Sequence, residues 1–193
     1  MAHVNLGERP HGLIGRLTGW YSRRMFGHVV EPARAVALHR GVAIAFGAAE
    51  MTAAKMWSRL DPRLCHLAVQ ASAGAIGCSW CIDFGYYEGM EKGLDPIRVR
   101  DVPRWRESSV YDERERAVLD YAEAASATPA AVSESLVERL HQFFSDEELV
   151  ELAAWVALEN LRSRFNAGLG LRSEAFSDRC AVRPQFGHQS SHL

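Results

Sequence analysis

The amino-acid sequence has no apolar run long enough to cross a bilayer, and this absence removes one broad class of protein. The longest apolar stretch, residues 35–49, is interrupted by His39 and Arg40, whereas a membrane-spanning helix needs about 20 consecutive apolar residues. Residues 1–10 are polar and hold no apolar segment of the kind that a secretory signal carries. We therefore expect a soluble, cytoplasmic protein.

Lysine, surplus charge and cysteine are also scarce. Lys55 and Lys92 are the two lysines, and the 22 basic and 24 acidic side chains leave a formal net charge of −2. A nucleic-acid-binding protein usually carries a basic surface, so this balance gives no indication of a nucleic-acid partner. Four cysteines in 193 residues are too few for a disulfide framework. The 48% hydrophobic content is enough for the core of a single domain.

Two of the four cysteines, Cys78 and Cys81, form a C-x-x-C motif at the expected start of a helix. Gly77 precedes the motif, and an amphipathic run to about Glu91 follows it. Residues three apart lie on one face of a helix, so the two sulfur atoms can meet. The partial positive charge at a helix N-terminus favours thiolate over thiol. In a reducing cytosol, such a pair is typical of thiol–disulfide chemistry.

Elsewhere apolar residues recur at helical spacing, and no segment shows the alternation of a strand. We therefore predict an all-α fold: a single helical-bundle domain over residues 1–193, in two helical halves. The core is expected at about residues 13–175, and residues 176–193 are expected to form a polar C-terminal tail. The helices are expected at residues 13–25, 31–60, 62–71, 78–91, 112–125, 135–144 and 146–166, with a connecting loop at 97–110.

Several of these helices have recognisable starts. Asp61-Pro62 combines an N-cap with proline at the first helical position. Serine and glutamate three residues apart, at 135 and 138 and again at 145 and 148, have the spacing of a capping box. The helix at 13–25 carries an apolar stripe beside arginines. This pattern is compatible with a membrane surface but is more typical of a helix packed on its own protein or on a neighbouring subunit.

Three segments in this order resemble the carboxymuconolactone decarboxylase superfamily, and the C-x-x-C motif resembles its alkyl hydroperoxidase D-like branch. The resemblance covers about residues 20–175. The segments are Leu60-Asp61-Pro62-Arg63-Leu64, the motif at Cys78 and Cys81, and Phe144-Ser145-Asp146-Glu147-Glu148-Leu149-Val150-Glu151-Leu152 leading to Asn160 and Arg164-Phe165-Asn166. The resemblance implies a thiol-dependent peroxidase that reduces organic hydroperoxides. It also implies a homo-oligomer that needs no metal, haem or flavin.

The same resemblance assigns roles to the two cysteines. Cys81 would attack the peroxide and become a sulfenic acid, and Cys78 would resolve it to a disulfide. An external thiol–disulfide reductant protein would then reduce that disulfide. Helix electrostatics instead favours Cys78 as the thiol of lower pKa, because the effect fades within the first turn. The sequence leaves open which cysteine attacks first.

The chain departs from the family at two site positions. His66 stands where the family has a glutamate, and Gly85 stands where it has a histidine. Imidazole titrates near neutral pH, so His66 is predicted to accept a proton from a thiol in place of the missing carboxylate; the alternative is a hydrogen-bonded core histidine. Gly85 indicates close packing of its helix. Asp83 is expected to point away from the cysteines, as a surface or intersubunit ion-pair residue.

Other functions are compatible with these departures. Without the usual glutamate and histidine, the chain could be a catalytically degenerate helical oligomer with a ligand-binding or structural role. Lactone decarboxylation, as in the name-giving branch, does not call for a C-x-x-C motif. Zinc would suit Cys65, His66, Cys78 and Cys81, but adjacent helical residues point about 100° apart. The redox interpretation is therefore favoured, and no role is assigned to Cys180.

Overall fold

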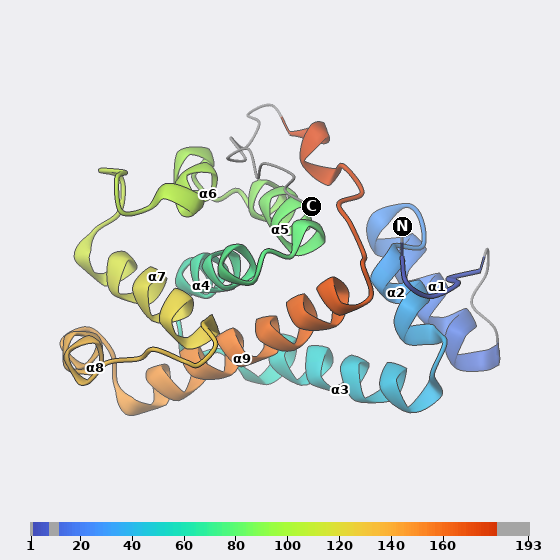
Figure 1. The fold of residues 1–193 in the computed structure, drawn as a ribbon, viewed down its shortest axis with the longest axis horizontal. Helices are drawn as coiled ribbons and strands as arrows, with labels where there is room; N and C mark the ends of the chain where they lie inside the picture. Colours follow the sequence, from blue (N-terminus) through green and yellow to red (C-terminus); the bar gives the residue numbers. More distant parts are fainter. Residues whose placement is uncertain (1, 8–11, 181–193) are drawn as a thin grey trace.

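The protein is a bundle of α-helices (Figure 1). The computed structural model describes residues 2–7 and 12–180, and within these ranges it contains helices and no strand. The predicted all-α fold is confirmed. The elements are α1 (Gly12–Phe26), α2 (Glu31–Ala37), α3 (Arg40–Met56), α4 (Pro62–Ile76), α5 (Ser79–Glu91), α6 (Pro96–Asp101), α7 (Glu113–Ser126), α8 (Glu134–His141), α9 (Asp146–Gly168) and the 3-10 helices η1 (Val102–Arg104) and η2 (Phe176–Arg179).

Side-chain caps explain where several helices begin. The Asp61 carboxylate accepts the backbone N–H of Arg63 at the start of α4. Ser145 opens α9 with both halves of the predicted capping box in place. The capping box predicted from Ser135 was wrong, because Ser133 caps α8 by accepting the N–H of Leu136 at 3.2 Å. Ser133 and Ser135 are both residues that favour an N-cap position, and the helix begins directly after the first of them.

Residues 31–60 form two helices instead of the single one predicted. α2 ends at Ala37, and His39 has an extended backbone (φ −131°, ψ 110°). The His39 ring caps α3 by accepting the N–H of Val42 at 3.3 Å. Alanine and other apolar residues are frequent on both sides of His39 and Arg40. Two polar residues are also common inside a helix, so periodicity alone cannot reveal the break.

The loop predicted at 97–110 instead begins with α6 and η1. Asp95 caps α6 by accepting the N–H groups of Ile97 and Arg98, and Pro96 occupies the first turn. This is the same cap-and-proline signal that marks α4, but the helix is only six residues long. A segment of that length is too short to show a helical period.

α4 lies at the centre of the bundle, in contact with α5, α7 and α9 (Figure 1). Residues from most sides of this helix are buried, and small ones let its neighbours approach closely. At its C-terminal end, Gly77 has a left-handed backbone (φ 79°), a conformation that glycine adopts without strain. The chain turns there directly into α5, which places the C-x-x-C motif at the edge of the core. The buried residues of α4 are Leu64, Cys65, His66, Leu67, Ala68, Gln70, Ala71, Ser72 and Ala73.

The segment after α9 returns to the start of α5. The predicted polar tail begins too early at residue 176, because Phe176 is fully buried and its ring packs against Trp80 and Phe84. Residues 176–180 therefore belong to the packed structure, and residues 181–193 lie outside the described part of the chain. Among the described helices, none combines the length and the apolar character that a bilayer span requires.

Candidate active site

The two cysteines of the motif meet at the N-terminus of α5. Cys78 is the N-cap of the helix, and its sulfur accepts the backbone N–H of Cys81 at 3.2 Å. The two residues form a disulfide, with Cα atoms 5.3 Å apart, within the usual range for this bond. The prediction that the two sulfur atoms can meet is confirmed, as is the helix that begins there.

The disulfide is enclosed. Cys78 is 1% exposed and Cys81 is 6% exposed. A cluster of apolar side chains surrounds the pair and joins α1, α2, α4, α5 and η2 at one place. The members are Val30, Ala73, Trp80 and Phe176, with Phe26, Ala33, Ile82, Phe84 and Tyr87 packed against them. Burial raises the electrostatic strength of any hydrogen bond that a sulfur atom receives there.

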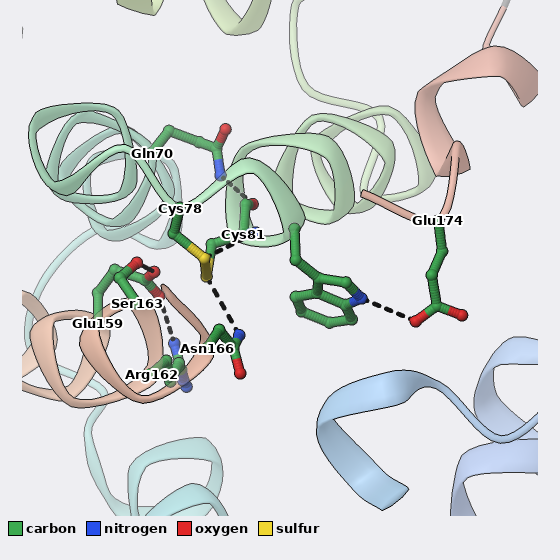
Figure 2. The surroundings of a disulfide bond; sticks show 9 residues. Gln70, Cys78, Cys81, Glu159, Arg162, Ser163, Asn166 and Glu174 are labelled. Carbon is green, nitrogen blue, oxygen red and sulfur yellow. Dashed lines mark hydrogen bonds and ion pairs between the residues drawn. A yellow bond between two sulfur atoms is a disulfide. The ribbon is translucent and has the colours of Figure 1, made fainter. Parts of the chain in front are cut away.

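One polar side chain of α9 contacts the disulfide directly. The amide of Asn166, itself buried, donates from Nδ2 to Sγ of Cys81 at 3.4 Å (Figure 2). Each sulfur atom therefore has a nitrogen donor: the Cys81 N–H for Cys78 and the Asn166 amide for Cys81. Donors of this kind stabilise a thiolate more than a thiol. Asn166 was part of the segment that carried the family resemblance, but the sequence did not indicate its contact with sulfur.

Glu159 lies on the same side of the disulfide, two turns earlier on α9 (Figure 2). Its carboxylate accepts the hydroxyl of Ser163 and lies 3.4 Å from the guanidinium of Arg162. Arg162 is held in turn by the carboxylate of Glu50 on α3. Burial raises the pKa of Glu159 to about 7, against the opposing influence of Arg162. Sequence reasoning missed this residue, because a glutamate in a long helix usually faces solvent.

Gln70 of α4 occupies the space beside Gly85. Its amide Nε2 donates to the backbone carbonyl of Cys81 at 3.4 Å. A Cβ atom on residue 85 would lie only 1.6 Å from that Nε2. The interpretation of Gly85 as a site of close helix packing is therefore confirmed. The position at which the family carries a histidine is filled here by the side chain of a neighbouring helix.

His66 lies elsewhere in the bundle. Its ring is buried against Gly89, where an added Cβ would lie 2.7 Å from Nε2, and its Nδ1 is 3.9 Å from Glu88. Gly89 is eight residues beyond Cys81, or about 12 Å along α5 at the usual helical rise. Nε2 of His66 has no hydrogen-bond partner, and burial lowers the pKa of this histidine to about 4. The structure does not bring His66 together with the two cysteines.

Asp83 was expected at the surface or in an intersubunit ion pair, and that expectation was wrong. The side chain is buried, and its carboxylate accepts the N–H groups of Phe176 and Ser177 and the hydroxyl of Ser173. Burial opposes ionisation of Asp83, but these hydrogen bonds outweigh it and lower the pKa of the carboxyl below its usual value. Asp83 thus fastens the segment after α9 to α5.

Glu174 makes a second set of contacts that hold the segment after α9 beside the motif. Its carboxylate accepts the indole N–H of Trp80 at 2.9 Å and the backbone N–H of Glu31 at 2.8 Å, and it pairs with His28 at 2.9 Å. Residues 172–180 therefore hold the motif from the C-terminal side, and the α1–α2 connection holds it from the N-terminal side. No signal in the sequence had identified Glu174.

The remaining cysteines lie apart from the motif. Cys65 is buried in the core cluster of α4 and α7, where burial raises the pKa of its thiol to about 12. Cys180 follows η2 and is partly exposed. Within the described residues, no three histidine, cysteine, aspartate or glutamate side chains gather in an arrangement that could hold a metal ion.

A cavity of about 470 Å³ also borders α4 and α5. Apolar side chains supply much of its wall, among them Ile82, Tyr86 and Val102, with Gln70 and Arg100 as polar members. Neither cysteine of the motif lines it. We therefore do not assign it as the place where the sulfur atoms react.

Fold and site together define an all-α protein with a cysteine pair bonded at a buried helix N-terminus. The model of the carboxymuconolactone decarboxylase family matches residues 40–124. YnjA of Escherichia coli (strain K12), described as uncharacterized, is 32% identical over 166 residues, which cover 84% of this chain and 89% of YnjA. The chain belongs to the carboxymuconolactone decarboxylase family, in its alkyl hydroperoxidase D-like branch.

Solved structures agree with this assignment. A protein of unknown function from Agrobacterium tumefaciens, described as a putative antioxidant defence protein AhpD, is 29% identical, with a TM-score of 0.63 over 67% of this chain and 88% of that one. An uncharacterized peroxidase-related protein from Ralstonia eutropha JMP134, with an alkylhydroperoxidase AhpD core, has a TM-score of 0.77 at 20% identity. The match covers 91% of this chain and 94% of the Ralstonia chain. At that identity the likeness shows the fold alone.

Proposed function

We propose that this protein is a thiol-dependent oxidoreductase that reduces organic hydroperoxides through the Cys78–Cys81 couple. The observation that carries the proposal is the bonded cysteine pair at the start of α5, with a nitrogen donor on each sulfur atom. This arrangement favours thiolates in the reduced form and a disulfide in the oxidised form. Family membership supports the same chemistry.

In the oxidative half of the reaction, the thiolate of Cys81 attacks the peroxide. An S–O bond forms and the O–O bond breaks; the alkoxide takes up a proton and leaves as the alcohol, and Cys81 becomes a sulfenic acid. The thiolate of Cys78 then attacks that sulfur, so that the S–S bond forms and hydroxide leaves as water. One peroxide and two thiols thus give one alcohol, one water and one disulfide.

Cys81 is assigned as the attacking residue for two reasons. It is the more exposed of the two, at 6% against 1% for Cys78, and it receives the Asn166 amide. Cys78 is then the resolving residue, and its sulfur is already directed at Cys81. His66 is given no step, because it lies about two turns further along α5.

The reductive half requires an external thiol donor, which we propose to be a thiol–disulfide reductant protein. Attack by its thiolate on Cys81 releases the thiolate of Cys78, and a second thiol of the donor then releases Cys81. The proposal involves no metal, haem or flavin, and it places the protein in a reducing cytoplasm, where a C-x-x-C pair can cycle.

Replacement of the attacking cysteine tests the proposal. Cys81→Ser is expected to abolish turnover of a small organic hydroperoxide in the presence of a dithiol, because no sulfur remains to form the sulfenic acid. Cys180→Ser should retain turnover, since Cys180 is not part of the motif. Mass spectrometry after peroxide treatment should show the loss of two hydrogens between Cys78 and Cys81 in the wild type. A wild-type protein that consumes no peroxide with any dithiol would favour a degenerate, non-catalytic protein instead.

A further inference from the structure

The thiol chemistry moves protons, and most groups that could carry them are remote or engaged. His66 lies about two turns away along α5, and residue 85 is a glycine. Asp83 is occupied by the segment after α9, because Ser173, Phe176 and Ser177 donate hydrogen bonds to its carboxylate. Resolution nevertheless requires the Cys78 thiol to lose a proton and the departing hydroxide to gain one.

α9 presents a polar face to the disulfide. Glu159, Ser163 and Asn166 follow one another at intervals of four and three residues, which places them on one side of a helix. Asn166 contacts Cys81. Figure 2 shows Glu159 and Ser163 on that same side, with the carboxylate directed toward Cys78. Glu159 and Ser163 are both buried.

We propose that Glu159 exchanges protons with the Cys78–Cys81 couple. As a carboxylate it accepts the proton of the Cys78 thiol, and as a carboxylic acid it gives that proton to the hydroxide leaving Cys81. During reduction the acid form protonates the Cys78 thiolate as the external thiolate bonds to Cys81. The carboxylate then regains a proton from the second thiol of the donor. This inference rests on the proposed function, because it assigns the proton carrier of the same couple.

The surroundings of Glu159 suit both protonation states. Burial favours the neutral acid, whereas Arg162 and the Ser163 hydroxyl favour the carboxylate. Glu50 of α3 holds Arg162 and so moderates its attraction for Glu159. Together these influences raise the pKa of Glu159 to about 7. A group that titrates near the working pH is the most efficient proton carrier.

The test follows reduction of the disulfide by dithiothreitol, so it does not depend on any peroxide. Rates are divided by the thiolate concentration of the reagent and compared between about pH 5.5 and about pH 8.5. In the wild type, the reduction rate per thiolate should fall as pH rises through about 7, when Glu159 loses its proton. Glu159→Gln should remove this step and should be slower by about tenfold at the acidic end.

Glu151→Gln is the matched control. Glu151 is another buried glutamate of α9, and it accepts the backbone N–H groups of Arg59 and Leu60 away from the motif. Glu151→Gln should be less stable than the wild type, but its reduction rate per thiolate should depend on pH as in the wild type. If Glu159→Gln retains the inflection and stays within about twofold of the wild type, the proposal is wrong.

A second measurement uses the wild type alone, in case Glu159→Gln does not fold. Infrared difference spectra between the oxidised and reduced protein, at a pH below 7, should show a change in the carboxylic-acid carbonyl band. The absence of any such change would contradict the proposal. A protein that shows the band and the pH step but consumes no peroxide would instead overturn the proposed function and leave the role of Glu159 intact.

Discussion

Glu151, Glu159 and Glu174 are shielded carboxylates, and each stabilises a different part of the molecule. Glu151 accepts the N–H groups of the two residues that lead into α4. Glu174 joins Trp80 to the α1–α2 connection. Glu159 bonds within α9 beside the disulfide. A buried carboxylate needs hydrogen-bond donors. The donors to Glu151 and Glu174 come from residues distant in sequence, whereas those to Glu159 lie on its own helix, so the pattern along the chain does not reveal that all three are shielded.

His66 and Glu159 should influence stability in opposite directions as the pH changes. The pKa of His66 falls from about 6.5 in the unfolded chain to about 4 in the folded protein. The unfolded chain therefore binds more protons in that interval, and stability is lost as the pH falls through it. The pKa of Glu159 rises to about 7. The folded protein then binds more protons between about pH 4.5 and about pH 7, so stability is lost as the pH rises.

Between pH 7 and pH 5 the two effects nearly cancel in the wild type, and single variants should separate them. When the pH falls from 7 to 5, Glu159→Gln should lose about 2 kcal/mol of unfolding free energy, because the destabilising effect of His66 remains. Over the same fall in pH, His66→Asn should gain about 2 kcal/mol of unfolding free energy, because the stabilising effect of Glu159 protonation remains. Urea unfolding at the two pH values measures both. Parallel behaviour of the two variants would contradict these pKa directions.

At the scale of single residues, the sequence predicted the bonded cysteine pair but not its surroundings. Cys78 and Cys81 were identified from spacing, because a local motif is enough to bring two sulfur atoms together. Asn166 and Glu159 reach the same place from a helix some 80 positions later in the chain. Asp83 was misplaced because its partners lie in the segment after α9, which shows no periodicity.

Among the elements, the contact between α4 and α5 is defined by a glycine facing a long polar side chain. In Gly85→Ala the added methyl group meets Gln70, whose amide must move and give up its bond to the Cys81 carbonyl. We expect a loss of about 1–2 kcal/mol of unfolding free energy, measured with urea. In a Gln70→Ala background the loss should disappear, because the space is then free.

Gly74 provides the comparison for this experiment. It also lies inside a helix, but a Cβ there would meet nothing within 4 Å. Gly74→Ala should therefore stabilise the protein by about 1 kcal/mol, through helix propensity alone. Equal effects of the two substitutions would show that Gln70 does not restrict residue 85.

Several helix starts were predicted, but the start of α6 and the interruption between α2 and α3 were not. Asp61, Asp112 and Ser145 are caps whose hydrogen bonds are made within three residues, so the sequence alone contains both partners. The break between α2 and α3 depends on His39 adopting an extended backbone. Nothing in the local pattern of alanine and apolar residues requires that break.

On the scale of the whole molecule, α1 and α3 leave large apolar side chains uncovered. In α1, Leu13, Leu17 and Trp20 are 73%, 57% and 60% exposed, so this stripe does not pack on its own chain. Met51 and Met56 of α3 are exposed as well. Exposed apolar surface of this extent is typical of protein–protein contacts. We propose that a neighbouring subunit covers this surface, which is the other alternative predicted for residues 13–25.

Light scattering coupled to size-exclusion chromatography tests this proposal. The wild type is expected to be a homo-oligomer, and Leu17→Glu should reduce its mass toward that of a monomer by placing a charge in the contact. Val150→Glu is the control, because Val150 is exposed on α9, outside α1 and α3. A monomeric wild type would contradict the assignment.

The enclosure of the motif also limits the access of other molecules to its sulfur atoms. Phe176 and the Glu174 carboxylate close over the start of α5 from one side, and α9 borders it on the other. Because Cys78 is 1% exposed and Cys81 is 6% exposed, we expect a bulky aromatic disulfide to reach Cys81 only if the covering segment shifts. Of two hydroperoxides with equal intrinsic reactivity, the smaller is therefore expected to react faster with this protein.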